Sequence, residues 1–158
     1  MSKVNYQKLR KRISLFEHEV QQKITCYNMG AWNEETIIAC GEETCHTGEG
    51  FSINKGKNDF LTSEEMEYAK VIPLDTVLEN KKISLLKMDI EGAEQNALEG
   101  AKKIIQQQTP KLAICIYHSV EDLWVIPLMI RDMFPRYTKY EMRHYANSFS
   151  ETVLYASL

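Results

Sequence analysis

The 158-residue chain carries a net charge of −3, with 44% hydrophobic and 26% charged residues, a composition typical of one globular domain. No concentrated Lys/Arg surface stands out, which disfavours nucleic acid as a partner. No stretch approaches the roughly 18 apolar residues of a membrane span, and no signal-peptide core opens the chain. Cys26, Cys40, Cys45 and Cys115 follow no disulfide-framework spacing, which favours a reducing, cytoplasmic setting.

The first half of the chain predicts a helix followed by short strands. Apolar residues at helical spacing predict a helix over residues 4–20, and residues 24–32 predict a strand that contains a turn. Thr36–Cys40 is β-rich, and Phe51–Ile53 is its expected hairpin partner. The mostly polar residues 55–67 predict a surface excursion.

The next segments predict strands that alternate with helices. Residues 70–78 predict a strand and then a helical turn that Asp75 caps. Ile83–Met88 is an apolar run typical of a parallel strand buried on both faces. A helix should follow, ended by Pro110. Its buried stripe would be Ala93, Ala97, Leu98, Ala101, Ile104 and Ile105.

A second buried strand is predicted over Leu112–Tyr117, and it ends on His118. We expect Ser119 to N-cap the following helix and Pro127 to lie near that helix's first turn. Pro135 should end the helix.

The chain closes with two predicted strands, Tyr137–Tyr145 and Thr152–Ala156, and Asn147 and Ser148 suit a hairpin turn between them. These two strands should therefore be antiparallel. The order strand, helix, strand, helix and hairpin predicts an α/β sheet with right-handed crossovers.

Three carboxylates, Asp89, Glu91 and Glu94, follow the Ile83–Met88 strand at the start of the next helix. In open α/β sheets, ligands bind at the carboxyl ends of the strands. Acids at a helix start can instead only complement the helix dipole, or they could hold a divalent ion. A carboxylate that ends a buried strand needs a partner or a water-filled cleft, which makes Asp89 the stronger site candidate.

A series of short motifs runs along nearly the whole chain. They are Asn28–Trp32, Pro73–Thr76, Lys87–Glu94, Ala97–Ala101, Pro110–Ile114, Tyr117–His118, Glu121–Trp124, Ile126–Pro127, Arg143–Tyr145 and Glu151–Ala156. In this order they resemble the FkbM-type family of S-adenosylmethionine-dependent methyltransferases. The resemblance implies one truncated methyltransferase-like domain over residues 1–158. Its fold would be an α/β, class I methyltransferase-like (Rossmann-like) sheet that ends in an antiparallel β-hairpin.

The resemblance also implies methyl transfer to an oxygen of a small-molecule acceptor, such as a sugar or small-metabolite hydroxyl, with S-adenosylmethionine as cofactor. The implied catalytic residues are His118 and Asp89, with His118 as the base because the ordinary pKa of histidine lies near working pH. The implied cofactor contacts are Asn28, Gly30, Ala31, Trp32 and Asp89. The implied substrate contacts are Glu91, Glu94 and His144. No metal is expected.

The first helix resembles the one that follows the family's second strand, so the family's first two strands and glycine turn have no counterpart here. We therefore expect an incomplete methyltransferase. Either Ile24–Tyr27 pairs beside the central strand, or a bare sheet edge invites a homodimer. One alternative is a non-catalytic binding or scaffold domain that reuses the fold. Another is a metal-dependent hydrolase that uses Asp89, Glu91, Glu94 and His118.

Overall fold

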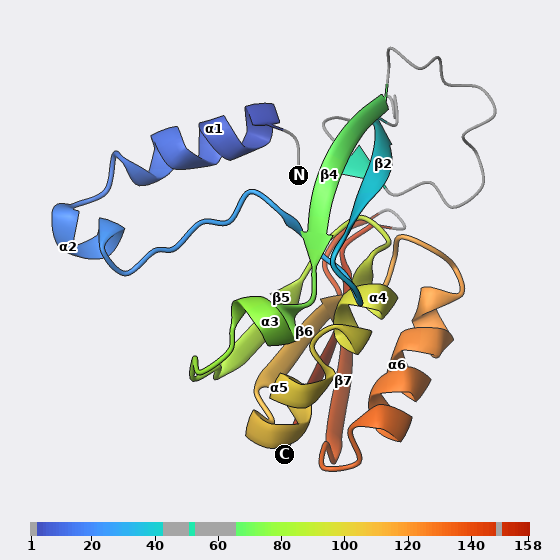
Figure 1. Ribbon diagram of the computed structural model, residues 1–158. Coiled ribbons are helices and arrows are strands. Elements are labelled where there is room, and N and C mark those ends of the chain that lie inside the picture. Colours follow the sequence, from blue (N-terminus) through green and yellow to red (C-terminus); the bar gives the residue numbers. More distant parts are fainter. Residues whose placement is uncertain (1–2, 43–50, 53–65, 148–149) are drawn as a thin grey trace. The chain divides into compact units, whose positions relative to one another are not determined.

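The computed structural model of the chain describes residues 3–42, 51–52, 66–147 and 150–158 (Figure 1). Its helices are α1 (Lys3–Ile13), α2 (His18–Gln21), α3 (Leu74–Val77), α4 (Glu94–Glu99), α5 (Lys102–Gln108) and α6 (Asp122–Met133). Its strands are β1 (Gly30–Ala31), β2 (Thr36–Glu42), β3 (Phe51–Ser52), β4 (Met66–Ile72), β5 (Leu85–Met88), β6 (Lys111–Cys115), β7 (Lys139–His144) and β8 (Thr152–Ser157). Of the polar excursion predicted over residues 55–67, residues 55–65 lie outside the described residues, as do Cys45 and Ser148, whereas residues 66–67 belong to β4.

The chain divides into two compact units. The first comprises Met1–Gly30 and Thr36–Val71, and the second comprises Ala31–Glu35 and Ile72–Leu158. The single domain expected over residues 1–158 stays a prediction.

The first unit contains α1, α2 and a sheet with the strand order β1-β4-β2-β3. β2 pairs antiparallel with both β3 and β4. The hairpin was predicted between Thr36–Cys40 and Phe51–Ile53, but β3 pairs with Gly41 and Glu42, whereas Thr36–Cys40 pairs with β4. Ile53 lies outside the described residues. The helix predicted over residues 4–20 is interrupted after Ile13. The interruption has a local cause, because the Ser14 hydroxyl donates to the Lys11 carbonyl at 2.8 Å and so competes with the helix ladder.

The strand predicted over residues 24–32 is wrong except at Gly30–Ala31. Ile24 and Tyr27 are 38% and 36% exposed, so the apolar side chains of this segment are not buried as those of a core strand would be. The alternative in which Ile24–Tyr27 pairs beside the central strand is therefore also wrong, because these residues form no strand.

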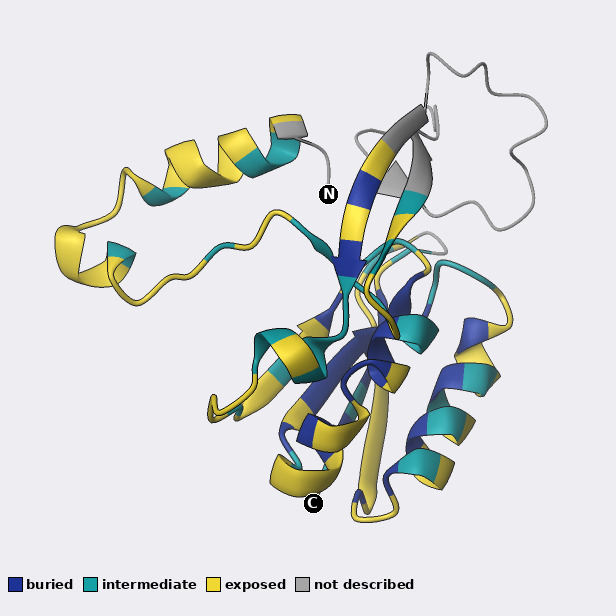
Figure 2. Cartoon of the chain, in the orientation of Figure 1, coloured by how far each residue is buried: buried dark blue, intermediate teal, exposed yellow. Residues whose placement is uncertain are grey.

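The second unit contains a sheet with the strand order β5-β6-β8-β7. β5 pairs parallel with β6, β6 pairs antiparallel with β8, and β8 pairs antiparallel with β7. The predicted α/β order, with a parallel pair followed by a closing hairpin, is thus confirmed. Figure 2 shows that β6 is buried whereas β7 is exposed along its length.

Alternate residues of β6 face opposite sides of this sheet, as the period of a strand requires. One face joins the main core cluster, to which α4, α5 and α6 all contribute. Its members include Ala97, Leu98, Ile105, Leu112, Ile114, Ile126, Ile130, Leu154 and Ala156. The other face forms a small cluster of Ala113, Cys115 and Val153. Cys115 is therefore a buried free thiol, as predicted.

The apolar stripe predicted from Ala93 to Ile105 is buried throughout, although two helices, α4 and α5, share it. Asp75 does not cap its own helical turn. Instead its carboxylate accepts hydrogen bonds from the backbone N–H groups of Lys103 and Ile104, both at 2.9 Å, and caps the start of α5. The local sequence suits a cap at Asp75, but tertiary packing decides which helix receives it.

Two expectations for α6 are corrected. Glu121 occupies the N-cap position, and Ser119 lies further upstream, where its hydroxyl accepts a hydrogen bond from the Glu121 N–H at 3.2 Å. Pro127 lies inside the helix, beyond its first turn. The carbonyl left without a donor belongs to Leu123, which is 40% exposed, so water can satisfy it. Pro135 follows the helix end, as predicted.

Within the described residues, no helix is long and apolar enough to cross a membrane.

β5 lies at one edge of its sheet. Leu85 is 59% exposed, so the prediction that this strand is buried on both faces is wrong. Among the described residues, the alternative in which a sheet edge is left bare is the one that the structure shows.

A homodimer through this edge stays a prediction. Light scattering should give a dimer mass for the chain and a monomer mass for Leu85→Lys, whereas Leu15→Lys in the first unit should change nothing. Equal masses for all three would contradict the edge interface.

Gly100 lies against the backbone of the segment that follows β1. A Cβ on Gly100 would meet the Trp32 carbonyl oxygen at 1.9 Å and the Asn33 Cα at 3.2 Å. These backbone atoms cannot rotate away, so Gly100→Ala should lower the free energy of unfolding by about 1–3 kcal/mol. Gly30→Ala should cost less, because its nearest contact is the Val71 side chain. Urea unfolding measures both, and a stabilised Gly100→Ala, the usual result in an open helix, would contradict the close approach.

Candidate functional site

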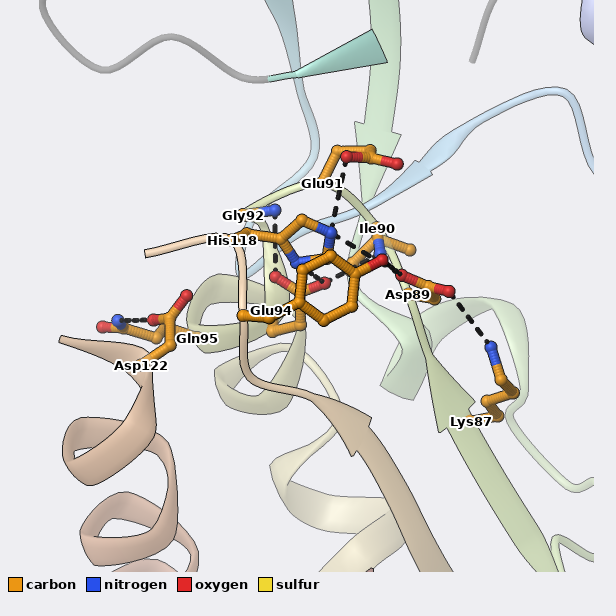
Figure 3. A network of polar contacts seen from close by, with 10 residues as sticks. Lys87, Asp89, Ile90, Glu91, Gly92, Glu94, Gln95, His118 and Asp122 are labelled. Carbon is orange, nitrogen blue, oxygen red and sulfur yellow. Dashed lines mark hydrogen bonds and ion pairs between the residues drawn. The ribbon is translucent and has the colours of Figure 1, made fainter. Parts of the chain in front are cut away.

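A cluster of charged side chains surrounds His118 at the carboxyl ends of β5 and β6 (Figure 3). Because these strands are parallel, Asp89 after β5 and His118 after β6 come to the same edge of the sheet. The Nδ1 atom of His118 lies 3.2 Å from Glu94 Oε1, and its Nε2 atom lies 3.4 Å from Glu91 Oε2 and 3.6 Å from Asp89 Oδ1. The structure thus brings the three acids and the histidine singled out from the sequence into one group, which we call the His118 cluster.

Glu94 organises the turn that carries the other two acids. Its Oε1 accepts a hydrogen bond from the Ile90 N–H at 2.8 Å, and its Oε2 accepts one from the Gly92 N–H at 3.0 Å. Glu91 and Gly92 are consecutive left-handed residues, with φ of 58° and 90°. The Glu94 side chain is 1% exposed, so its negative charge needs partners within the protein. The two N–H groups and His118 are these partners.

His118 is held where its protonated form is favoured. Its side chain is 8% exposed and both ring nitrogens are buried. Burial alone would lower its pKa, but Glu94, Glu91 and Asp89 outweigh burial, and the pKa of His118 is raised above its usual value. The ring also packs against the ring of Tyr117, with centroids 4.2 Å apart.

Asp89 stays ionised for a related reason. Its Oδ1 accepts a hydrogen bond from the Tyr117 hydroxyl at 3.1 Å, and its Oδ2 accepts one from Lys87 Nζ at 3.4 Å. Burial acts to raise the pKa of Asp89, yet hydrogen bonds from Cys115 and Tyr117 and the charge of Lys87 lower it overall. Burial and the charge of Asp89 raise the pKa of the Cys115 thiol to about 12, so this thiol is no nucleophile at neutral pH.

Stability should fall as the pH rises above the ordinary range of histidine. The pKa of His118 is higher in the folded chain than the unfolded value of about 6.5. Its protonated form therefore adds stability that is fully present below about pH 6.5 and is lost as the pH rises through the folded-state pKa. Urea midpoints measured at about pH 6 and about pH 9 should differ in the chain and differ less in His118→Gln. An equal difference in both would contradict this role of His118.

Several residues of the site were not singled out from the sequence. Gln95 Nε2 donates to Asp122 Oδ1 at 2.8 Å and links the start of α4 to the start of α6 (Figure 3). Lys87 and Tyr117 hold the two oxygens of Asp89. Their positions in the sequence could have indicated Lys87 and Tyr117 as site residues. Lys87 lies two residues before Asp89, which by strand periodicity is the same face, and Tyr117 directly precedes His118.

A pocket of about 500 Å³ lies next to Tyr117. We call it the Tyr117 pocket, and its lining residues are Tyr117, Ser119, Val120, Leu123, His144, Ala146, Asn147 and Thr152. Of the three expected substrate contacts, only His144 lines it. Its Nδ1 lies 2.8 Å from the Thr152 hydroxyl. Glu91 and Glu94 belong to the His118 cluster instead.

The expected cofactor contacts are divided between the two units of the chain. Asn28 and Gly30 belong to the first unit, whereas Ala31, Trp32 and Asp89 belong to the second. Ala31 packs against the core cluster, and the Trp32 N–H donates to the Ile72 carbonyl at 3.1 Å. Both oxygens of Asp89 have protein partners. The role of these residues as cofactor contacts stays a prediction.

The geometry of a metal centre is also not formed among the described residues, where no group of three or more His, Cys, Asp and Glu side chains is placed to hold an ion. The hydrolase alternative requires four donors within about 2–2.6 Å of one ion. In the His118 cluster each ring nitrogen instead faces a carboxylate as an ion pair.

Comparisons with known proteins indicate the same family as the sequence motifs. A family model described as "Methyltransferase FkbM domain" matches residues 5–145. The structure is similar to the crystal structure of methyltransferase FkbM from Methylobacillus flagellatus KT, with a TM-score of 0.74 and 25% sequence identity. The match covers 98% of this chain and 34% of that one, so the chain spans about a third of that protein's length. No curated protein sequence matches the chain.

Proposed function

The chain belongs to the FkbM methyltransferase family, as the motifs predicted, and from this premise we propose that it serves methyl transfer to an oxygen of a small hydroxylated acceptor, such as a sugar or small-metabolite hydroxyl. The observation that supports this most is the His118 cluster, which sets a histidine among three carboxylates beside the Tyr117 pocket. An imidazole in such a place suits proton removal from a hydroxyl.

His118 is the base in this proposal. It accepts the acceptor's hydroxyl proton when it is neutral, so the reaction needs a pH above its raised pKa. Asp89, Glu91 and Glu94 then stabilise the imidazolium that forms. Glu91 has the most exposed side chain of the three acids, at 41%, and lies 3.4 Å from Nε2, the ring nitrogen that takes up the proton in this proposal.

S-adenosylmethionine, the cofactor that FkbM methyltransferases generally use, supplies an activated methyl group when bound. The described residues account for the acceptor and proton side of the reaction only. We therefore assign the binding of the hydroxyl compound to the Tyr117 pocket and the removal of its proton to His118.

A second candidate function is a binding or scaffold domain that has the fold without catalysis. Two observations favour it. Both ring nitrogens of His118 are buried, and the expected cofactor contacts Ala31 and Trp32 are engaged within the second unit.

Calorimetric titration with S-adenosylmethionine and S-adenosylhomocysteine separates the two candidates. The methyltransferase proposal expects micromolar binding that is lost in Asp89→Ala. It should persist in Asp132→Ala, a control that removes a 63% exposed carboxylate on α6. With binding established, release of S-adenosylhomocysteine in the presence of hydroxylated acceptors should rise with pH. No heat at millimolar ligand would favour the binding domain.

The proposal also includes a reducing compartment, such as the cytoplasm, as the location of the chain. Cys26 and Cys115 are free thiols, which supports that setting. Nucleic acid has no place in the proposal, because the net charge of −3 disfavours phosphate binding.

A further inference from the structure

The Tyr117 pocket has an apolar surface that is open to ligands. Val120 and Leu123 contribute large apolar side chains that are 70% and 40% exposed, and Ala146 adds a third apolar group. Apolar side chains gathered at a concave site are typical of a place where a ligand covers them. A volume of about 500 Å³ suits a small molecule of one or two rings.

The polar groups of the pocket suit one hydroxyl. The Tyr117 hydroxyl already donates to Asp89, and the Ser119 hydroxyl already pairs with Glu121. The His144 Nδ1 is paired with Thr152, which leaves the ring edge at Nε2 and the Asn147 amide to meet a ligand. Both can donate to or accept from an alcohol.

Charge decides which ligands the pocket excludes. No Lys or Arg is among the residues that line it, so an anionic ligand would find no opposite charge inside. Carboxylates flank it, because Asp89 is bonded to Tyr117, Glu121 to Ser119, and Glu151 directly precedes Thr152. A phosphate or carboxylate on the ligand would therefore be both unpaired and repelled.

We infer that the Tyr117 pocket is the acceptor site and that it selects an alcohol that is carried on an apolar ring and has no anionic group. This inference rests on the proposed function and deepens it, since the pocket adjoins the His118 cluster through Tyr117. His144 is then a specificity-determining residue, as the sequence suggested for a substrate contact.

Binding of three matched compounds tests the inference on the whole chain without cofactor. The compounds are 2-naphthylmethanol, 2-naphthylmethyl phosphate and 2-naphthylmethylamine, which share one ring and differ in charge. Chemical-shift titration should show the alcohol bound with perturbed resonances at His144 and Thr152. The phosphate should bind at least tenfold more weakly than the alcohol and than the amine. Binding of the phosphate as tight as that of the alcohol would overturn the inference.

Two tryptophan substitutions locate the ligand. Val120→Trp fills the pocket from a 70% exposed position, where folding should tolerate the change, and it should weaken binding of the alcohol at least tenfold. Leu128→Trp is the matched control, because Leu128 is 45% exposed on α6 and does not line the pocket. Equal affinity in Val120→Trp and the unmodified chain would overturn the assignment.

The readout separates this inference from the proposed function. If the alcohol binds as expected but S-adenosylmethionine gives no heat, the pocket stands and methyl transfer fails. If the cofactor binds and the phosphate is the preferred ligand, methyl transfer stands and the selection against anionic acceptors fails.

Discussion

Replacing Glu94 with alanine should lower the free energy of unfolding by about 3–5 kcal/mol, the range for breaking a buried ion pair. The side chain is 1% exposed and joins three partners, namely the N–H groups of Ile90 and Gly92 and the ring of His118. Alanine would leave two part-buried donors without their acceptor and remove the carboxylate nearest to the imidazole. Urea unfolding followed by tryptophan fluorescence measures the loss.

Two further variants make the Glu94 result specific. Glu94→Gln keeps the size and an acceptor oxygen but removes the charge, so its loss should be smaller than that of alanine. Glu79→Ala, at an exposed position of the same unit, should change the free energy of unfolding by only about 0.5 kcal/mol. A loss below about 1 kcal/mol in Glu94→Ala would contradict the role of Glu94 in holding the turn.

Replacing His118 with asparagine should lower the rate of methyl transfer by about 10²–10⁴-fold, the usual contribution of a general base. Asparagine fills part of the same space and stays polar, but it cannot take up the hydroxyl proton. The measurement is release of S-adenosylhomocysteine as a function of pH. In the unmodified chain the acidic limb should lie above about pH 6.5, because the pKa of His118 is raised, and in the variant that limb should disappear.

Two other histidines serve as controls for His118. His144→Asn should raise KM with little effect on kcat, since His144 lines the Tyr117 pocket and has no contact with the His118 cluster in the structure. His18→Asn, on the exposed face of α2, should leave both constants unchanged. If His118→Asn retains the rate and the acidic limb, another group is the base.

The second unit could be predicted largely from the sequence because its signals are regular. The apolar runs at Ile83–Met88 and Leu112–Tyr117 lie within or next to β5 and β6, and Pro110 and Pro135 lie just beyond the ends of α5 and α6. The burial of β5 could not be predicted in this way. Leu85 has the composition of a buried strand residue but lies at a sheet edge, and only the strand order determines that.

The residues of the His118 cluster were accessible to prediction because strand ends can be located. Acids after one parallel strand and a histidine after the next must come to the same edge. The division of roles among the acids could not be predicted. Glu94 is 1% exposed and Glu91 41% exposed, a difference set by the backbone turn at residues 90–92. The prediction that Asp75 caps its own helical turn was wrong for a similar reason. Its carboxylate instead accepts a hydrogen bond from Lys103, which is 28 residues away in sequence.

The left-handed backbone at Glu91 places this position in conflict with its own side chain. A residue with a Cβ pays roughly 1–2 kcal/mol for that conformation, and glycine would avoid it. The ion pair that the 41% exposed Glu91 makes with His118 offsets only part of this. The turn is thus less stable than its backbone allows, and glycine at residue 91 would relax it while removing one of the three carboxylates around His118. Any programme that selects only for thermostability should drive this position toward glycine, and with Glu91 it would remove one of the charges that raise the pKa of His118.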